Sequence, residues 1–214
     1  MRIAIVDYGS GNLRSAEKAF EKAAQEYEID AEVVVTSNAD TVVNADRVIL
    51  PGVGAFADCY QGLNALGGMV EALGEFALKK ARPFLGICVG MQLLADRGLE
   101  HGTHEGLGWI CGEVRQIVSK HVHMKVPHMG WNTLQINHGR SKLFNGIKDG
   151  SHVYFVHSFR FVPTEASHVI ASVEYGPNIV AALVRDNIAG TQFHPEKSQA
   201  HGLRLIANFL SWSP

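Results

Sequence analysis

Short apolar runs alternate with helical patterns along the first half of the chain, and this alternation limits the possible folds more than any other feature. The runs expected to form strands are Ile3–Asp7, Ala31–Thr36, Val48–Leu50 and Pro83–Ile87. Helical patterns lie between them at 13–27 and 69–80, and the first carries an apolar stripe of Leu13, Ala16, Ala19, Phe20, Ala23 and Ala24, with Ser10 or Asn12 as its expected cap. This alternation predicts a parallel sheet with helices on both faces.

The second half of the chain, after Glu100, changes to short alternating strands. They are expected at Val114–Val118, Thr133–Ile136, Val153–Val156, Val169–Val173 and Val180–Arg185, before a final helix at about 201–210. No internal repeat, low-complexity tract or long linker separates the halves. We therefore predict a single domain over residues 1–214, with an α/β, flavodoxin-like fold. Its mixed, mostly parallel sheet should carry helices on both faces and continue into a β-rich second half.

The composition indicates a soluble enzyme. The 214 residues carry a net charge of −2 and the basic residues are scattered, so we expect neither nucleic-acid binding nor membrane binding. The apolar start at 3–6 is too short for a signal peptide and no apolar run could span a bilayer, so a cytoplasmic location is expected. Cys59, Cys88 and Cys111 form no disulfide framework, as expected where thiols stay reduced.

Cys88 lies where the apolar run ending at Ile87 becomes a helical pattern at 91–95. Gly86 and Gly90 flank it, so we expect a sharp turn that directs the thiol toward solvent above the sheet edge. The N–H groups and positive dipole end of the following helix favour a thiolate and offer donors to an oxyanion. Cys88 is therefore a candidate nucleophile, and a small buried core residue is the alternative.

His194-Pro195-Glu196 follows the expected strand at 188–193 and supplies what a nucleophilic cysteine requires. Such a cysteine needs a base, and the base needs a group that orients it. Pro195 stiffens the loop, and a spacing of two lets His194 and Glu196 face one cleft. Alone this string is weak evidence, since a loop histidine is usually solvated, but together with the cysteine turn it favours nucleophilic catalysis.

Four strings in the chain resemble the class I, or triad, glutamine amidotransferases, and among them the glutaminase subunits of imidazole glycerol phosphate synthase. They are Val6-Asp7-Tyr8-Gly9-Ser10-Gly11-Asn12-Leu13, Leu50-Pro51-Gly52-Val53-Gly54-Ala55, Pro127-His128-Met129-Gly130-Trp131-Asn132 and His194-Pro195-Glu196-Lys197-Ser198. The resemblance covers essentially the whole chain. It implies Cys88 as nucleophile, His194 as general base and acid, and Glu196 as the carboxylate that orients the imidazole.

The resemblance also implies an oxyanion strand at Pro51-Gly52-Val53-Gly54, a segment that sequence physics alone equally allows to be a flexible turn. Gly52 would ease rotation of one peptide, and the N–H groups of Val53 and Val89 are the expected donors to the glutamine carbonyl.

The substrate L-glutamine needs groups for its α-ammonium and α-carboxylate. By family position Gln92 and Glu100 suit the ammonium, and the backbone around Ser158 and Phe159 suits the carboxylate. Without the resemblance, a solvated helix face and loop would be the preferred interpretation of Gln92 and Glu100.

The histidines at 121, 123 and 128 raise the question of a metal, because the first two would share one face of a strand. No cysteine pair or acidic ligand completes a zinc site locally, so we predict no metal and no cofactor. The neighbouring string from Pro127 to Asn132 instead resembles a family segment near a docking face. Asn12, Trp131, Tyr154 and Lys197 match positions at that face, although Trp131 could be a core aromatic and Lys197 an ordinary solvated lysine.

The resemblance implies a partner, because the chain contains no phosphate loop or second site that would consume ammonia. That partner would be a (β/α)8-barrel cyclase that forms a heterodimer with this chain and makes imidazole glycerol phosphate and an aminoimidazole carboxamide ribotide in histidine biosynthesis. Three alternatives stay open, namely another class I amidotransferase, a cysteine peptidase on a similar sheet, and an inactive interaction subunit. The first is disfavoured by the strings at 7–13 and 127–132, the last by the intact triad.

Overall fold

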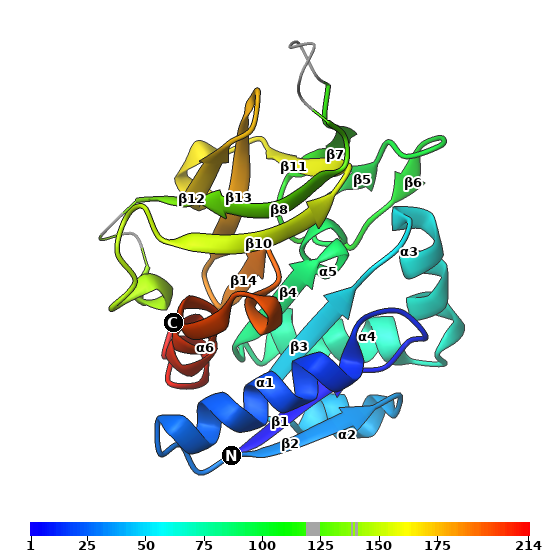
Figure 1. Ribbon diagram of the computed structural model, residues 1–214. Coiled ribbons are helices and arrows are strands. Elements are labelled where there is room, and N and C mark those ends of the chain that lie inside the picture. The colour runs from blue at the N-terminus through cyan, green and yellow to red at the C-terminus, as the bar shows by residue number, and fades with distance from the viewer. Residues whose placement is uncertain (119–124, 138, 140) are drawn as a thin grey trace.

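An eight-stranded sheet runs through the centre of the molecule (Figure 1). The computed structural model describes residues 1–118, 125–137, 139 and 141–214. The parallel strands are, in spatial order, β2 (Glu32–Thr36), β1 (Arg2–Val6), β3 (Arg47–Gly52), β4 (Phe84–Cys88) and β14 (Ile188–Thr191). The sheet continues with antiparallel β13 (Asn178–Arg185), β12 (Val169–Glu174) and β9 (Gln135–Ile136). The predicted mixed, mostly parallel sheet is confirmed.

Two smaller sheets lie beside the antiparallel part. One pairs β10 (His152–His157) with β8 (His128–Thr133). The other has four strands, in the order β11 (Phe159–Pro163), β7 (Gly112–Gln116), β5 (Arg97–Gly98) and β6 (His104–Glu105). These strands all come from the chain after β4, as the prediction of a β-rich second half requires.

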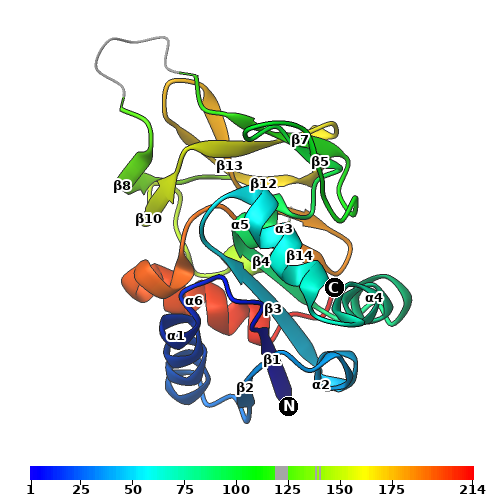
Figure 2. The ribbon, with the colours of Figure 1, turned by 90° about the vertical axis from the view of Figure 1, so that its right-hand side faces the viewer.

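Helices cover both faces of the parallel sheet (Figure 2). On one face lie α1 (Leu13–Glu26) and α6 (Gln199–Leu210), which pack against each other. The other face carries α2 (Ala39–Asn44), α3 (Phe56–Ala65), α4 (Met69–Gly74) with its π-helical continuation η1 (Glu75–Lys79), and the short α5 (Val89–Gln92). Single 3-10 turns are η2 (Lys142–Phe144), η3 (Ala166–His168) and η4 (Pro195–Lys197). Among the described residues, no helix has the length and apolar character that crossing a membrane requires.

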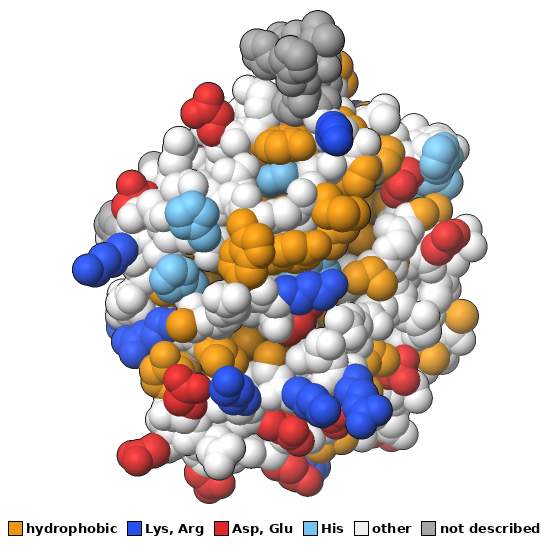
Figure 3. Space-filling model, in the orientation of Figure 1, with side chains coloured by type: hydrophobic (Ala, Val, Ile, Leu, Met, Phe, Trp, Pro, Cys, Tyr) orange, Lys and Arg blue, Asp and Glu red, His pale blue; other side chains and the backbone are white. Residues whose placement is uncertain are grey.

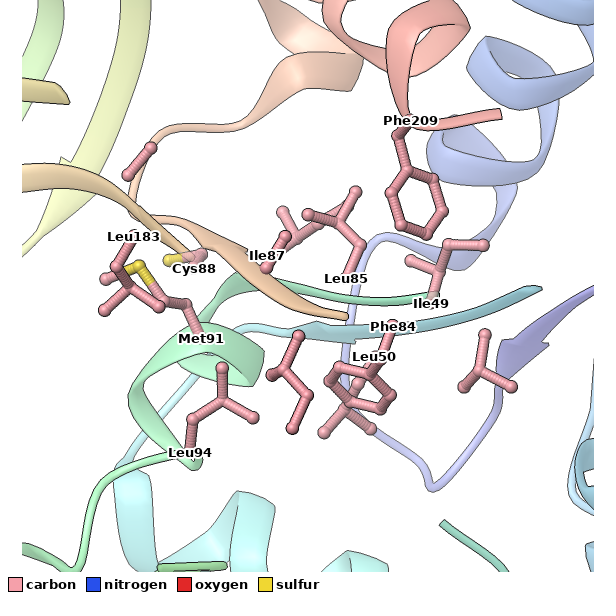
Figure 4. Packing of buried hydrophobic residues seen from close by; sticks show 14 of the residues in the cluster. Ile49, Leu50, Phe84, Leu85, Ile87, Cys88, Met91, Leu94, Leu183 and Phe209 are labelled. Carbon is pink, nitrogen blue, oxygen red and sulfur yellow. The ribbon is translucent and has the colours of Figure 1, made fainter. Parts of the chain in front are cut away.

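The apolar stripe of α1 is buried as predicted, apart from the partly buried Leu13. Phe20 of that stripe meets Phe209 of α6 edge-on, with ring centroids 6.5 Å apart. Figure 4 shows Phe209 pointing toward Ile49 and Leu85 of the central strands. The same cluster of buried side chains continues through β13 into the second half, so one hydrophobic core serves both halves of the chain.

The carboxyl ends of three parallel strands meet at one edge of the sheet. Gly52 at the end of β3 pairs with Cys88 at the end of β4, and Thr191 of β14 pairs with Ile87. The residues that leave β3 and β14 therefore start beside Cys88, at the edge where open α/β sheets commonly bind ligands.

Several local predictions need correction. The helices α2 and α3 were not predicted, and β8 lies ahead of the strand expected at 133–136. Asn12 does occupy the N-cap of α1, but its side chain makes no capping hydrogen bond within the described residues. The helix expected after Cys88 has only four residues, because the carbonyls of Leu93, Leu94 and Ala95 accept hydrogen bonds from the loop at 107–110.

Candidate active site

Cys88 occupies a strained turn between β4 and α5. Its φ of 55° and ψ of −111° lie outside the regions that L-residues usually adopt, at a typical cost of about 1–3 kcal/mol. The flanking glycines serve a different purpose from the one predicted, since the unusual angle falls on Cys88 itself. A Cβ on Gly90 would overlap the carbonyl oxygen of Leu50, and a Cβ on Gly86 would lie against the backbone of Gly90. Both glycines therefore permit close packing of α5 onto the strands.

The thiol lies in a cavity of about 300 Å³ above the sheet edge. Cys88 is only 3% exposed, so the expectation of a thiol projecting into solvent is wrong. The turn directs the side chain into a cavity, and the cavity walls cover it. Of the predicted substrate and oxyanion residues, all except Gly52 line this cavity. Its lining consists of Val53, Gly54, Cys88, Val89, Gln92, Glu100, Pro127, Val156, His157, Ser158 and Phe159.

His194 and Glu196 form a buried pair beside Cys88. Nδ1 of His194 lies 2.7 Å from Oε1 of Glu196, and the two side chains are 2% and 3% exposed. Burial disfavours the charged imidazole, but the neighbouring Cys88 sulfur and the Glu196 carboxylate outweigh burial and raise the pKa of His194 to about 10. Nε2 makes no regular hydrogen bond to the described residues. With Nδ1 engaged by the carboxylate, Nε2 is the nitrogen free to exchange a proton with the sulfur.

The loop that carries His194 is tied to β10 by one backbone–backbone hydrogen bond and by the hydroxyl of Ser198. The N–H of His194 donates to the carbonyl of Tyr154 at 3.0 Å. The buried Ser198 hydroxyl donates to the carbonyl of His194 at 2.7 Å and accepts from the N–H of Tyr154 at 3.0 Å. These bonds fix the imidazole relative to the strand whose other residues form the cavity wall.

Gln192 is a site residue that sequence analysis missed. It is fully buried, and its Nε2 lies 3.7 Å from the sulfur of Cys88. Its Oε1 accepts a hydrogen bond of 3.0 Å from Nε2 of Gln92, which also donates to the carbonyl of Phe159 at 3.0 Å. A long polar side chain two residues before His194, where the chain leaves a strand, is the signal that could have indicated it.

The Gly52-Val53 peptide lies against Cys88 and is held from behind. A Cβ on Gly52 would come within 2.7 Å of both the backbone N of Gly90 and the hydroxyl of Tyr8, which explains the glycine. The N–H of Val53 donates to Oγ of Ser10 at 3.2 Å, and the same hydroxyl donates to the carbonyl of Val53. In this conformation the Val53 N–H is bound to Ser10, which does not line the cavity, so its use as an oxyanion donor requires rotation of the peptide.

The remaining oxyanion and substrate candidates keep groups that face the cavity. Val89 is the first residue of α5, so its N–H has no acceptor within that helix. Glu100 accepts a 2.7 Å hydrogen bond from the N–H of Phe56, which fixes one carboxylate oxygen at the start of α3. Ser158, which follows β10, and Phe159, the first residue of β11, also line the cavity.

Three of the predicted docking residues form one surface cluster. Trp131 of β8 pairs with Tyr154 of β10, their rings meet edge-on at 5.9 Å, and Nζ of Lys197 lies 5.8 Å from the Tyr154 ring centre. Trp131 is 47% exposed, which excludes the core alternative. Figure 3 shows hydrophobic side chains gathered in a band over these two strands. Asn12 lies at the start of α1, which packs against η4, the turn that contains Lys197.

The histidines at 121, 123 and 128 were not expected to bind a metal, and His128 is the only one of the three in the part of the chain that the structure describes. His121 and His123 lie outside the described residues, and His128 is buried against His157. Within the described ranges no group of three or more His, Cys, Asp or Glu side chains is arranged to hold a metal ion.

The fold and the site agree with the class of protein that comparison identifies. The sequence model of the family described as glutamine amidotransferase class-I matches residues 4–212, so the chain belongs to the class I glutamine amidotransferases, a family of enzymes. Solved structures share the fold. A glutamine amidotransferase from Thermotoga maritima has a TM-score of 0.62 and 20% identity, and the match covers 92% of this chain and 76% of that one. Another glutamine amidotransferase has a TM-score of 0.70 and 16% identity over 97% of both chains.

Relatives of high identity place the chain within that class. Imidazole glycerol phosphate synthase subunit HisH of Rhodospirillum rubrum is 60% identical, and its counterparts in Brucella suis and Agrobacterium fabrum are 58% and 57% identical. Each of these alignments covers 100% of this chain and 100% of the relative. Within the class I glutamine amidotransferases, the chain thus belongs to the HisH family.

Proposed function

We propose that this chain is the glutaminase subunit of imidazole glycerol phosphate synthase and hydrolyses L-glutamine to glutamate and ammonia in histidine biosynthesis. The observation that carries the proposal is the buried His194–Glu196 pair beside Cys88 in a cavity. Membership of the HisH family supports the assignment to this synthase over other amidotransferases. We further propose that residues 1–214 act as one glutamine amidotransferase domain.

In the proposed first half-reaction, Nε2 of His194 takes the thiol proton and the sulfur of Cys88 attacks the side-chain amide carbon of glutamine. The raised pKa of His194 supports this step, because it makes the imidazole a stronger proton acceptor. Backbone N–H groups of Val89, and of Val53 after rotation, hold the oxyanion. His194 then protonates the departing nitrogen, and ammonia leaves with a thioester remaining on Cys88.

In the second half-reaction, His194 takes a proton from water, which attacks the thioester carbonyl. The tetrahedral intermediate collapses with cleavage of the carbon–sulfur bond, and glutamate is released. Gln92 and Glu100 hold the α-ammonium group of the substrate, and the backbone at Ser158 and Phe159 holds its α-carboxylate. These four residues all line the same cavity, which supports their assignment.

The ammonia needs an acceptor subunit, which we propose is a (β/α)8-barrel cyclase in a heterodimer with this chain. The docking face comprises Trp131, Tyr154 and Lys197, with Asn12 at its rim. Its closeness to the site supports the proposal, because Lys197 follows Glu196 directly and the carbonyl of Tyr154 holds His194. A path closed by the partner would keep ammonia from bulk water while the cyclase makes imidazole glycerol phosphate and aminoimidazole carboxamide ribotide.

Glutamate release should be slow for the chain alone and rise on the order of 100-fold with the cyclase and its ribotide substrate. The measurement is a glutaminase assay with and without these components, and peptides containing glutamine should stay uncleaved. If a cyclase that uses ammonia well gains no glutamine-dependent synthesis from this chain, the proposed function is wrong.

Lys197→Ala should reduce the stimulation of glutaminase activity by the cyclase and its substrate, because it removes the cation over the Tyr154 ring without touching the cavity.

A further inference from the structure

Two buried histidines connect the docking strand β8 to the cavity wall. His128 of β8 is 2% exposed and His157 of β10 is 6% exposed. Nδ1 of His128 lies 3.0 Å from Nε2 of His157, and Nδ1 of His157 lies 2.8 Å from the carbonyl oxygen of Phe159. These contacts form a series of hydrogen bonds that ends at Phe159 on one side. On the other side it ends at Asn132, whose Nδ2 lies 3.1 Å from Nε2 of His128.

The donors and acceptors in this series of hydrogen bonds can be assigned in only one way. The carbonyl of Phe159 can only accept, so Nδ1 of His157 carries a proton and its Nε2 accepts from Nδ1 of His128. Nε2 of His128 then accepts a hydrogen bond from Nδ2 of Asn132. The Oδ1 of Asn132 accepts from the N–H of Thr133, which places the amide nitrogen, a donor, on the side of His128. Every link is satisfied when both imidazoles are neutral.

The surroundings of the two rings favour that neutral state. His128 is stacked between Phe155 and Tyr175, with ring centres 4.7 and 3.9 Å away. Burial lowers the pKa of His128 to about 4. Burial likewise lowers the pKa of His157 to about 3, although the hydrogen bond to Phe159 acts in the opposite direction. Neither ring is charged at neutral pH, so the pair acts through hydrogen bonds.

The Phe159 carbonyl, which is the acceptor at the end of this series of hydrogen bonds, belongs to the active site. The carbonyl of Phe159 receives a second hydrogen bond from Nε2 of Gln92. The same Nε2 contacts Oε1 of Gln192, whose own Nε2 lies 3.7 Å from the sulfur of Cys88. A shift of the Phe159 carbonyl would therefore move the amide of Gln92 and, through Gln192, a polar neighbour of the sulfur.

We propose that His157 is a positioning residue for the glutaminase site and that His128 connects it to the docking strand. His157 holds the Phe159 carbonyl at the distance that sets the amide of Gln92, and His128 fixes the tautomer in which His157 can donate. This inference rests on the proposed function.

Two substitutions at position 157 separate the two hydrogen bonds. In His157→Asn the amide reaches the place of Nδ1 and can still donate to Phe159, whereas in His157→Gln it reaches the place of Nε2 and keeps only the bond to His128. In complex with the cyclase, His157→Gln should lose about tenfold in kcat/KM, mainly through a higher KM for glutamine. His157→Asn should recover most of that loss. If His157 only stabilised the fold, the loss of kcat/KM in each variant would follow the fall in its melting temperature, with no advantage for asparagine. That result would overturn the proposal.

Imidazole NMR on the parent chain tests the same inference without turnover. Long-range ¹H–¹⁵N spectra should show His157 and His128 as neutral Nδ1–H tautomers between pH 6 and 8. An Nε2–H tautomer at His157 would overturn the inference even if glutamine is hydrolysed. A parent complex that fails to hydrolyse glutamine while showing the expected tautomers would instead contradict the proposed function.

Discussion

A complex of the cyclase with a Cys88→Ala chain is expected to lose glutamine-dependent synthesis on the order of 10⁴-fold or more, while synthesis from added ammonia continues. The substitution removes the nucleophile and leaves the cyclase untouched. Its effect on folding should be small, because the hydrogen-bond contacts of the sulfur with the carbonyl of Val156 and with Gln192 are long, at 3.9 Å and 3.7 Å. Parallel rate measurements with glutamine and with ammonium salts check this result.

Cys59→Ala is the matched control for this experiment. Both thiols are buried, but Cys59 contacts Ser10 and the carbonyl of Val53 behind the proposed oxyanion strand and does not line the cavity. It should retain far more glutamine-dependent synthesis than Cys88→Ala. Undiminished use of glutamine by the Cys88→Ala complex would remove Cys88 from the mechanism.

Val53→Pro should reduce partner-stimulated glutamine hydrolysis on the order of 100- to 1000-fold, the usual effect of losing one oxyanion donor. The N–H of Val53 donates to Ser10 in this structure, and we expect the partner to favour a rotated peptide that directs it at the substrate. Proline deletes the N–H and leaves Cys88, His194 and Glu196 in place. The assay compares stimulated rates, with thiol labelling of Cys88 as evidence that the site is intact.

Val53→Ala is the control, because proline also restricts the residue before it. Alanine keeps the N–H, and the valine side chain is already 40% exposed, so little packing is lost. This variant should stay responsive to the partner. Equal stimulation of the two variants would mean that rotation of the Gly52-Val53 peptide is not the gate.

The sequence predicts the parallel sheet well, because its signals are local. Short apolar runs and the α1 stripe follow from residue periodicity. The meeting of Cys88 with Val53 follows from topology, since the carboxyl ends of adjacent parallel strands share one edge. His194 and Glu196 were predicted as a pair from their spacing and from family resemblance, and they lie 2.7 Å apart.

Features that depend on tertiary packing could not be predicted in this way. The burial of Cys88 comes from cavity walls contributed by β10 and β11, which are distant in sequence. The roles of Gln192 and of the pair His128 and His157 depend on contacts across several strands. The early end of α5 likewise reflects hydrogen bonds from a loop more than ten residues downstream.

The proposed chemistry is tested most directly by mapping the residue that a glutamine-like electrophile modifies. Cys88 lies in the cavity, Cys59 is buried elsewhere and Cys111 is exposed. A nonspecific alkylating agent should therefore label Cys111, and this labelling is the reference for the selectivity of the electrophile. Peptide mass mapping should find the electrophile on Cys88, with Cys59 and Cys111 spared and free glutamine protecting the site. Loss of glutaminase activity with the label on another residue and Cys88 unmodified would contradict the account.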